Sequence, residues 1–273
     1  MDTERCMGSP VSVRILSSEK ENKITTTLQF ELRHLKDDIH AGEFVMVWVP
    51  GLDEIPMSVS YWKKPVAAIT VKSIGDTTEA LINLEKGDWI GIRGPFGTRF
   101  SQHGKNTLIV AGGIGIAPLR PLVDSLLSQK KKVVLVIGAK TERELILYDF
   151  ESFKDSNFTL KIATDDGSRG RKGFATSVAH DLIESNSFDA LYACGPEFMM
   201  AKLHEIAKKQ EILFEASLER YMKCGCGLCG TCGIDPNGEL VCLDGPVFSG
   251  KQLEKMGDFG RSFRDSTGKK KQY

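Results

Sequence analysis

Five of the seven cysteines in this chain of 273 residues lie between positions 224 and 242, whereas Cys6 and Cys194 stand alone. A disulfide framework would spread its cysteines through a small secreted domain, and a chain of this length is not one. The charged N-terminal residues are followed by no apolar stretch, so they do not form a secretory signal. Such clustering in a protein that we expect to be cytoplasmic favours a metal site.

The cysteine cluster begins with the spacing Cys224-x4-Cys229-x2-Cys232, and Cys242 follows after nine more residues. This is the plant-type spacing of a [2Fe–2S] cluster held by four thiolates. Glycines between the cysteines permit the positive φ of a tight loop, and their N–H groups can hydrogen-bond the cluster sulfurs. The residues leave two alternatives open, a zinc site and a redox dithiol. We expect Cys226, inside the loop, to fill space rather than to bind metal.

The N-terminal part of the chain, residues 10–100, is typical of a small antiparallel barrel or sandwich. Short runs rich in Val, Ile, Thr and Phe alternate with glycine and proline turns. The expected strands are 11–16, 25–32, 43–49, 58–61, 67–73 and 89–93. The pair Gly75-Asp76 is interpreted as one of the turns.

Beyond Lys105 the pattern changes to strands that alternate with helices, which predicts a parallel sheet covered by helices on both faces. We expect strands at 107–111, 133–138, 159–163 and 190–194. We expect helices up to about 129, from about Thr141, at 175–184 and from 197 to about 209. The predicted organisation is thus a barrel domain at 1–102, an α/β domain at 103–213 and a cysteine-bearing subdomain with its tail at 214–273.

Composition excludes two classes of partner. Lys and Arg together number 36, as do Asp and Glu, so the net charge of zero gives no reason to expect nucleic acid. No run of apolar residues approaches the ~20 that cross a bilayer, so we expect no membrane contact. The five histidines are scattered and do not form a catalytic group with a nucleophile.

Two glycine turns predict a nucleotide site at the ends of the parallel strands. The first follows a buried strand and opens a helix; it contains Gly112, Gly113, Gly115 and Pro118. The second is Cys194-Gly195-Pro196, also between a strand and a helix. Such turns place N–H groups where a pyrophosphate can bind, although a glycine turn can also serve packing alone. Cys194 would face the nicotinamide or would be a buried structural cysteine.

These features together resemble the ferredoxin–NADP reductase superfamily. Residues 219–224 (ERYMKC), the cysteine loop and residues 242–248 (CLDGPVF) are similar to the electron-transfer subunits of NAD-dependent dihydroorotate dehydrogenase. The resemblance extends over about 11–253 and makes the first domain a flavin-binding barrel and the second a nicotinamide-binding domain.

The resemblance implies FAD, one [2Fe–2S] cluster and NAD as cofactors of an oxidoreductase component in pyrimidine biosynthesis. It also implies a partner, the FMN-containing dihydroorotate dehydrogenase catalytic subunit, in a heterotetramer of two plus two chains. Electrons from dihydroorotate would pass through the cluster to FAD and leave as hydride to NAD⁺. We expect the partner to dock at the cysteine loop, 224–233.

The flavin residues that the resemblance implies depart from the family pattern at two positions. They are Pro56, Met57, Ser58, Val71, Lys72, Thr77 and Thr78. Ile55 replaces the arginine that holds the pyrophosphate in the family, and Thr77 stands where glycine is usual. A lost charge-assisted contact of this kind is worth ~1.5–3 kcal/mol, so Lys63, Lys72 or Arg93 would need to replace it.

Other readings of the sequence remain open. The segment Ala139-Lys140-Thr141 has no acidic residue to bind a ribose 2′-hydroxyl, so the residues alone leave NAD and NADP both open. The turn 165–167 (DDG) is either the nucleotide loop of the family or a solvated turn. The alternative function is a related NAD(P)H reductase subunit of a hydrogenase or a ferredoxin-dependent oxidoreductase. A third reading is an iron–sulfur sensor without flavin turnover.

Overall fold

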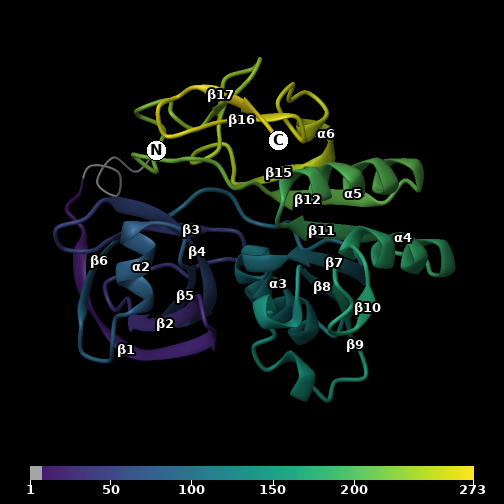
Figure 1. The fold of residues 1–273 in the computed structure, drawn as a ribbon, viewed down its shortest axis with the longest axis horizontal. Coiled ribbons are helices and arrows are strands. Elements are labelled where there is room, and N and C mark those ends of the chain that lie inside the picture. Colours follow the sequence, from purple (N-terminus) through teal and green to yellow (C-terminus); the bar gives the residue numbers. More distant parts are fainter. Residues whose placement is uncertain (1–7) are drawn as a thin grey trace.

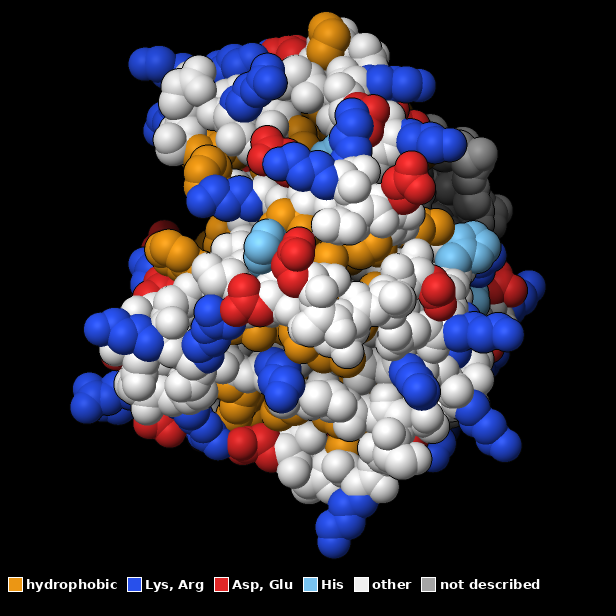
Figure 2. All heavy atoms as spheres, turned by 90° about the vertical axis from the view of Figure 1, so that its right-hand side faces the viewer, with side chains coloured by type: hydrophobic (Ala, Val, Ile, Leu, Met, Phe, Trp, Pro, Cys, Tyr) orange, Lys and Arg blue, Asp and Glu red, His pale blue; other side chains and the backbone are white. Residues whose placement is uncertain are grey.

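The computed structural model describes residues 8–273, so residues 1–7 of the expected barrel domain, with Cys6, lie outside the described part. The barrel and an α/β sheet lie side by side, and the C-terminal segment covers one side of both (Figure 1). Within residues 8–273 no helix is long and apolar enough to cross a bilayer. Positive and negative side chains are interspersed over the face drawn in Figure 2, so that face has no field of a single sign.

Six antiparallel strands close into a barrel, the first of the two expected β architectures. They are β1 (Val11–Asn22), β2 (Thr25–Glu31), β3 (Phe44–Trp48), β4 (Glu54–Lys63), β5 (Val66–Lys72) and β6 (Trp89–Phe96), in the order β1-β2-β5-β4-β3-β6. Ile15, Phe30 and Ile69 are almost wholly buried in its core. Closure pairs every strand on both sides, which removes the exposed edges of an open sheet.

Helix α2 (Asp76–Ile82) connects β5 to β6, where the sequence predicted only a turn. The Thr78 hydroxyl accepts hydrogen bonds from the N–H groups of Ile74 (2.8 Å) and Gly75 (3.0 Å) and donates to the Gly75 carbonyl. Leu81 is fully buried against the barrel core. The turn therefore continues into a helix because the hydroxyl satisfies the first backbone groups and the apolar side packs.

The second domain is a sheet with the order β10-β9-β8-β7-β11-β12-β15, and its last strand, β15 (Val247–Ser249), comes from the C-terminal segment. Its elements are β7 (Asn106–Gly112), η1 (Gly113–Gly115), α3 (Ile116–Ser128), β8 (Lys132–Ala139), β9 (Phe158–Thr164), β10 (Arg171–Lys172), α4 (Ala175–Ser185), β11 (Ala190–Cys194), α5 (Glu197–Lys209) and β12 (Leu213–Ser217). Leu108 and Val110 of β7 pack in one core with α4 and α5, whereas Ile109 and Ala111 pack in the other with α3. Both faces are therefore covered, as predicted, because successive side chains point to opposite faces.

The prediction of a helix from about Thr141 is wrong. The structure has only two short 3₁₀ segments there, η2 (Glu142–Glu144) and η3 (Phe150–Ser152). Between them Tyr148 has a φ of +47°, which an α-helix does not allow, and its hydroxyl donates to Thr70 Oγ1 in the barrel at 2.9 Å. Contact with the barrel therefore overrides the local preference for a helix.

The C-terminal segment leaves the sheet after β12 and returns to it as β15 (Val247–Ser249), which pairs antiparallel with β12. The remaining elements are β13 (Gly233–Ile234), β14 (Glu239–Leu240), α6 (Gly250–Leu253), β16 (Ser262–Arg264) and β17 (Lys270–Gln272). The Thr98 hydroxyl, beyond β6, donates to the Val247 carbonyl at 2.8 Å. The cysteine loop is thus held between two strands of the sheet and is tied to the barrel.

Candidate functional site

The two predicted glycine turns meet backbone to backbone. A Cβ added at Gly195, where φ is +144°, would lie 2.8 Å from the Cα of Gly112. A Cβ added at Gly115 would lie 2.3 Å from the carbonyl oxygen of Cys194. Any side chain at these positions would push the turns apart, so close approach requires glycine at both, and at Gly195 the positive φ requires it as well.

A cavity of about 440 Å³ opens where the turns meet, at the C-terminal ends of the parallel strands. Gly112, Gly113, Gly195 and Pro196 line it, together with Lys72 from the end of β5 in the barrel. Gly115 and Pro118, the other residues predicted there, are buried beneath the turn. The cavity therefore lies between both domains, at the strand ends where open α/β sheets bind nucleotides.

Glu219 contributes a carboxylate to this cavity that the residue patterns did not single out. It follows β12, it lines the cavity, and burial raises its pKa while the nearby Lys72 ammonium opposes that shift. Cys194 does not line the cavity. Its Sγ lies behind Glu219, 4.0 Å from Glu219 Oε1. Burial, with the Glu219 charge beside it, raises the pKa of this thiol, so Cys194 remains a neutral group behind the acid.

Aromatic and charged side chains complete the walls; the sequence had pointed to Lys140 and to the turn 165–167, but not to the two phenylalanines or to Lys202. Phe174 and Phe198 are large, exposed and line the cavity. Lys202 Nζ lies 4.7 Å from the ring centroid of Phe198. Asp165 and Lys140 also line it, and the Asp165 N–H donates to the Ala139 carbonyl at 3.1 Å. Exposed rings and mixed charges suit a ligand with an aromatic base and phosphates.

Of the residues expected to hold a flavin, only Lys72 lines this cavity. Pro56, Met57 and Ser58 are half-buried in β4; Val71 is buried at the end of β5; Thr77 is half-buried in α2. Lys72 itself lines the cavity, with its Nζ 3.3 Å from Glu144 Oε2. The Thr78 hydroxyl already makes hydrogen bonds with the backbone of Ile74 and Gly75 at the start of α2.

Arg93, one candidate to replace the missing arginine, is engaged elsewhere. Its guanidinium forms a forked ion pair with Glu54, with Nε 2.8 Å from Oε1, and Nη2 donates to the Cys224 carbonyl at 3.1 Å. The side chain therefore ties the barrel to the cysteine loop.

The cysteine loop has free thiols at all four predicted ligand positions, Cys224, Cys229, Cys232 and Cys242. Cys226 is disulfide-bonded, so its thiolate is not a metal donor in this structure. Within residues 8–273 no three His, Cys, Asp or Glu side chains are grouped as a metal site as they stand. The case for a cluster therefore rests on the donor set and its surroundings.

Backbone N–H groups surround these sulfurs. The N–H of Gly227 donates to Cys242 Sγ at 3.1 Å, and the N–H of Cys242 donates to Cys232 Sγ at 3.4 Å. Leu228 N–H donates to Cys224 Sγ at 3.3 Å. These donors stabilise thiolate charge in the way that the loop of an iron–sulfur protein does.

The loop has one buried and one exposed side. A Cβ at Gly225, where φ is +73°, would lie 2.7 Å from the Met46 side chain of β3. On the other side Leu228 is 66% exposed, and Tyr221 and Leu243 are also exposed apolar residues. The candidate ligands therefore lie between the barrel and an apolar surface.

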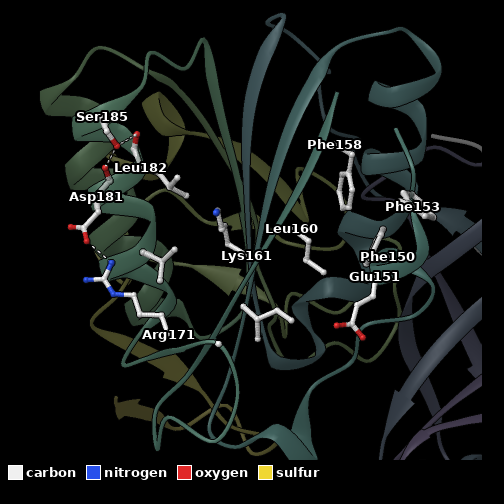
Figure 3. Close-up of a pocket in the computed structure, with 13 residues that line it drawn as sticks. Phe150, Glu151, Phe153, Phe158, Leu160, Lys161, Arg171, Asp181, Leu182 and Ser185 are labelled. Carbon is white, nitrogen blue, oxygen red and sulfur yellow. Dashed lines mark hydrogen bonds and ion pairs between the residues drawn. The ribbon is translucent and has the colours of Figure 1, made fainter. Parts of the chain in front are cut away.

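A larger cavity of about 720 Å³ lies at the edge of the sheet along β9. Arg171 pairs with Asp181 of α4 on one side of it, and Phe150, Phe153 and Phe158 lie on the other (Figure 3). None of the residues predicted for the nucleotide, the flavin or the metal lines it. The predicted nucleotide and metal residues therefore lie at the smaller cavity and in the cysteine loop.

Comparison with protein families matches two parts of the chain. The iron–sulfur cluster binding domain of dihydroorotate dehydrogenase B matches residues 219–254, and the oxidoreductase NAD-binding domain matches residues 109–205. The first match contains all four candidate ligands. The second contains both glycine turns.

Curated relatives match nearly the whole chain. The probable dihydroorotate dehydrogenase B (NAD(+)) electron transfer subunit of Methanocaldococcus jannaschii is 41% identical over 269 residues, which are 98% of this chain and 100% of that protein. The corresponding protein of Pyrococcus furiosus is 46% identical over 230 residues, 84% of this chain and 86% of that one.

Solved structures share the fold. The NADH-dependent reduced ferredoxin-NADP oxidoreductase, described for flavin-based electron bifurcation, is 30% identical with a TM-score of 0.79, covering 93% of this chain and 92% of that chain. A ferredoxin NADP⁺ reductase from Neisseria gonorrhoeae with bound FAD and NADP is 16% identical, with a TM-score of 0.64 over 76% and 98% of the two chains. The second likeness shows a common fold only.

Proposed function

The chain belongs to the family of electron-transfer subunits of dihydroorotate dehydrogenase B, with its NAD-binding and iron–sulfur-binding domains, and we propose that it conducts electrons between a catalytic partner and NAD through one [2Fe–2S] cluster and FAD. The observation that carries this proposal is the continuity of the chain. One segment, 218–223, leads from the nucleotide cavity directly into the cysteine loop.

Cys224, Cys229, Cys232 and Cys242 are the proposed ligands of the cluster. Their four free thiols, the inward N–H donors and the match of 219–254 support that assignment. A [2Fe–2S] cluster would supply transfer of single electrons at this place.

FAD is the proposed second cofactor, supported by the ferredoxin reductase-like fold and by Lys72, the one predicted flavin residue that lines the cavity. A bound flavin would convert between hydride transfer with NAD and the transfer of single electrons. Because Arg93 and Lys72 are paired with carboxylates, we infer that neither fully replaces the arginine lost at Ile55.

The proposed partner is the FMN-containing catalytic subunit that oxidises dihydroorotate, in a heterotetramer of two plus two chains. Leu228, in the cysteine loop, and Leu243, which lies beside Gly227 of the loop, are exposed apolar side chains and support docking beside the cluster, because neighbouring exposed apolar side chains mark protein interfaces. Docking there would also bring the electron donor of the partner close to Cys229, which is an exposed candidate ligand.

NAD rather than NADP is the proposed nucleotide, because Asp165 places a carboxylate in the cavity where it would repel a 2′-phosphate. Asp165→Ser is expected to raise the ratio of kcat/KM for NADPH to that for NADH about tenfold, since Lys140 would then face the phosphate with less opposition. Dye reduction with each nucleotide measures the ratio.

The matched control is Asp166→Asn. Asp166 is bonded to Ser168 and does not line the cavity, so its loss should leave the ratio unchanged. An Asp165→Ser protein with the original preference would show that this carboxylate does not select the nucleotide.

The similarity to the ferredoxin-NADP oxidoreductase favours a second candidate, a reductase subunit of a ferredoxin-dependent enzyme. Identities of 41% and 46% to the dihydroorotate dehydrogenase B subunits favour the first.

Purification of the chain with its partner tests the proposed function. We expect visible absorbance of flavin and cluster that both bleach with NADH, and a partner that reduces NAD⁺ with dihydroorotate. A partner with [4Fe–4S] clusters and no dihydroorotate oxidation would instead establish the ferredoxin-dependent alternative. A chain with iron but no flavin after addition of FAD would contradict the flavin assignment.

A further inference from the structure

A buried ion pair lies beside the second glycine turn, outside the lining of the nucleotide cavity and outside the cysteine loop. Arg220 Nη2 donates to Glu197 Oε1 at 2.7 Å, and the side chains of Arg220 and Glu197 are only 6% and 3% exposed. Burial raises the pKa of Glu197, and the Arg220 charge opposes that shift. Such a pair is costly to bury and is kept only when its geometry and further hydrogen bonds are good.

A hairpin near the C-terminal end completes the pair's hydrogen bonds. The Tyr273 hydroxyl donates to Glu197 Oε2 at 2.9 Å and accepts from Arg220 Nη1 at 3.1 Å. Arg220 Nη1 also donates to the Ser262 carbonyl at 3.0 Å, and the Gly260 N–H donates to Glu197 Oε1 at 2.9 Å. Residues of the β16–β17 hairpin and its flanks thus hydrogen-bond both charged side chains.

The two charged residues occupy special positions in the chain. Glu197 is the first residue of α5 and directly follows Gly195-Pro196, which line the nucleotide cavity. Arg220 directly follows Glu219, which also lines that cavity, and precedes the first candidate ligand Cys224 by four residues. The ion pair therefore joins the nucleotide turn to the segment that enters the cysteine loop.

The pair also affects the charge at the start of α5. The first turn of a helix favours negative ligands, since its free N–H groups carry partial positive charge. An unpaired Glu197 carboxylate at this end would compete with a phosphate in the cavity. Arg220 neutralises it, so the pair keeps this end of the cavity suited to an anion.

We propose that Arg220 is a positioning residue, clamped by Glu197 and Tyr273, that holds the nucleotide turn and the entry to the cysteine loop in one geometry. This inference rests on the proposed function, because it takes the cavity as the NADH site and the four cysteines as cluster ligands. Loosening the clamp should change nucleotide binding and the cluster together, although the clamp touches neither the cavity wall nor a cysteine.

Tyr273→Phe is the decisive variant, because it removes one hydroxyl and keeps the ring that packs at a tilt against Phe263, 5.0 Å between centroids. We expect the Kd for NADH to rise about three- to tenfold, as a charge-assisted hydrogen bond is lost. We also expect iron per chain to fall, or the EPR signal of the reduced cluster to shift. Arg220→Lys, which keeps the charge but loses the fork, should act in the same direction and more strongly.

Arg264→Gln is the matched control. It breaks the exposed pair of Arg264 with Asp235 in the same hairpin and does not touch Glu197 or Arg220. It should leave the NADH Kd, the iron content and the EPR signal at wild-type values. A Tyr273→Phe protein that matches wild type in all three, or that changes only one of the two sites, overturns the inference.

The same measurements on the unchanged holoprotein test the proposed function separately. Wild-type chain without bound iron or without NADH binding would refute the proposed function. Wild-type chain with both, and a Tyr273→Phe variant indistinguishable from it, would refute only the clamp.

Discussion

Replacing Cys232 with serine is expected to lower the iron content of the chain about tenfold or more and to abolish electron transfer between the partner and NAD. Cys232 is buried, and its sulfur accepts a hydrogen bond from the Cys242 N–H. A serine hydroxyl stays protonated at neutral pH and is a harder donor, so it does not replace a thiolate on iron. Iron analysis and EPR of the reduced protein measure the loss.

NADH binding should survive in the Cys232→Ser protein, because Cys232 does not line the nucleotide cavity. The matched control is Cys226→Ser in the same loop, which should retain iron because Cys226 is disulfide-bonded and is not a proposed ligand. The reverse pattern, with iron retained in Cys232→Ser and lost in Cys226→Ser, would show that the ligand set is wrong.

Local chemistry explains why much of the architecture could be predicted from the sequence. The spacing of the cysteines restricts which loops can hold them, and this predicted an iron–sulfur domain, the kind of domain that matches 219–254. Glycine turns at strand ends, Gly112 and Gly195, could be paired in advance because parallel strands bring their C-terminal ends to one edge. The cysteine spacing and the glycine turns both depend on the geometry of short segments, so they can be recognised in the sequence.

The wrong and missing predictions depend on contacts between distant segments. The apolar residues after Thr141 fit a helix, but Tyr148 bonds to Thr70, 78 residues away, and the segment is irregular. Glu219 was noted only as the first residue of the motif 219–224, and its place in the cavity was not predicted because it depends on where β12 ends relative to Lys72 in the barrel. The Arg220 and Glu197 pair likewise joins segments whose contact no spacing predicts.

Gly115→Ala is expected to weaken NADH binding at least about tenfold and to lower the melting temperature. The added Cβ would lie 2.3 Å from the Cys194 carbonyl oxygen and 2.4 Å from its carbon, so backbone must move. Gly115 has an ordinary helical conformation, φ −58° and ψ −10°, so the effect comes from contact alone. Overpacking of this kind costs ~1–3 kcal/mol, or roughly 2–10 °C for a chain of this size.

Displacement of the turns explains why binding should suffer along with stability. Gly115 lies under the first glycine turn and Cys194 begins the second, so the movement separates Gly112 from Gly195, which both line the cavity. A shift of about 1 Å in a positioned ligand site can cost on the order of 100-fold in rate. NADH titration and thermal unfolding of the holoprotein measure the two effects.

Gly113→Ala provides the contrast, because it lies in the same turn with no atom within 4 Å of an added Cβ. Its φ of +55° makes alanine cost ~1 kcal/mol through conformation alone. Gly113→Ala should therefore lose some stability while the two turns remain in contact, and it should bind NADH more tightly than Gly115→Ala. Equal Kd values for the two variants would mean that the close approach of the turns does not shape the site, and that their glycines serve backbone conformation only.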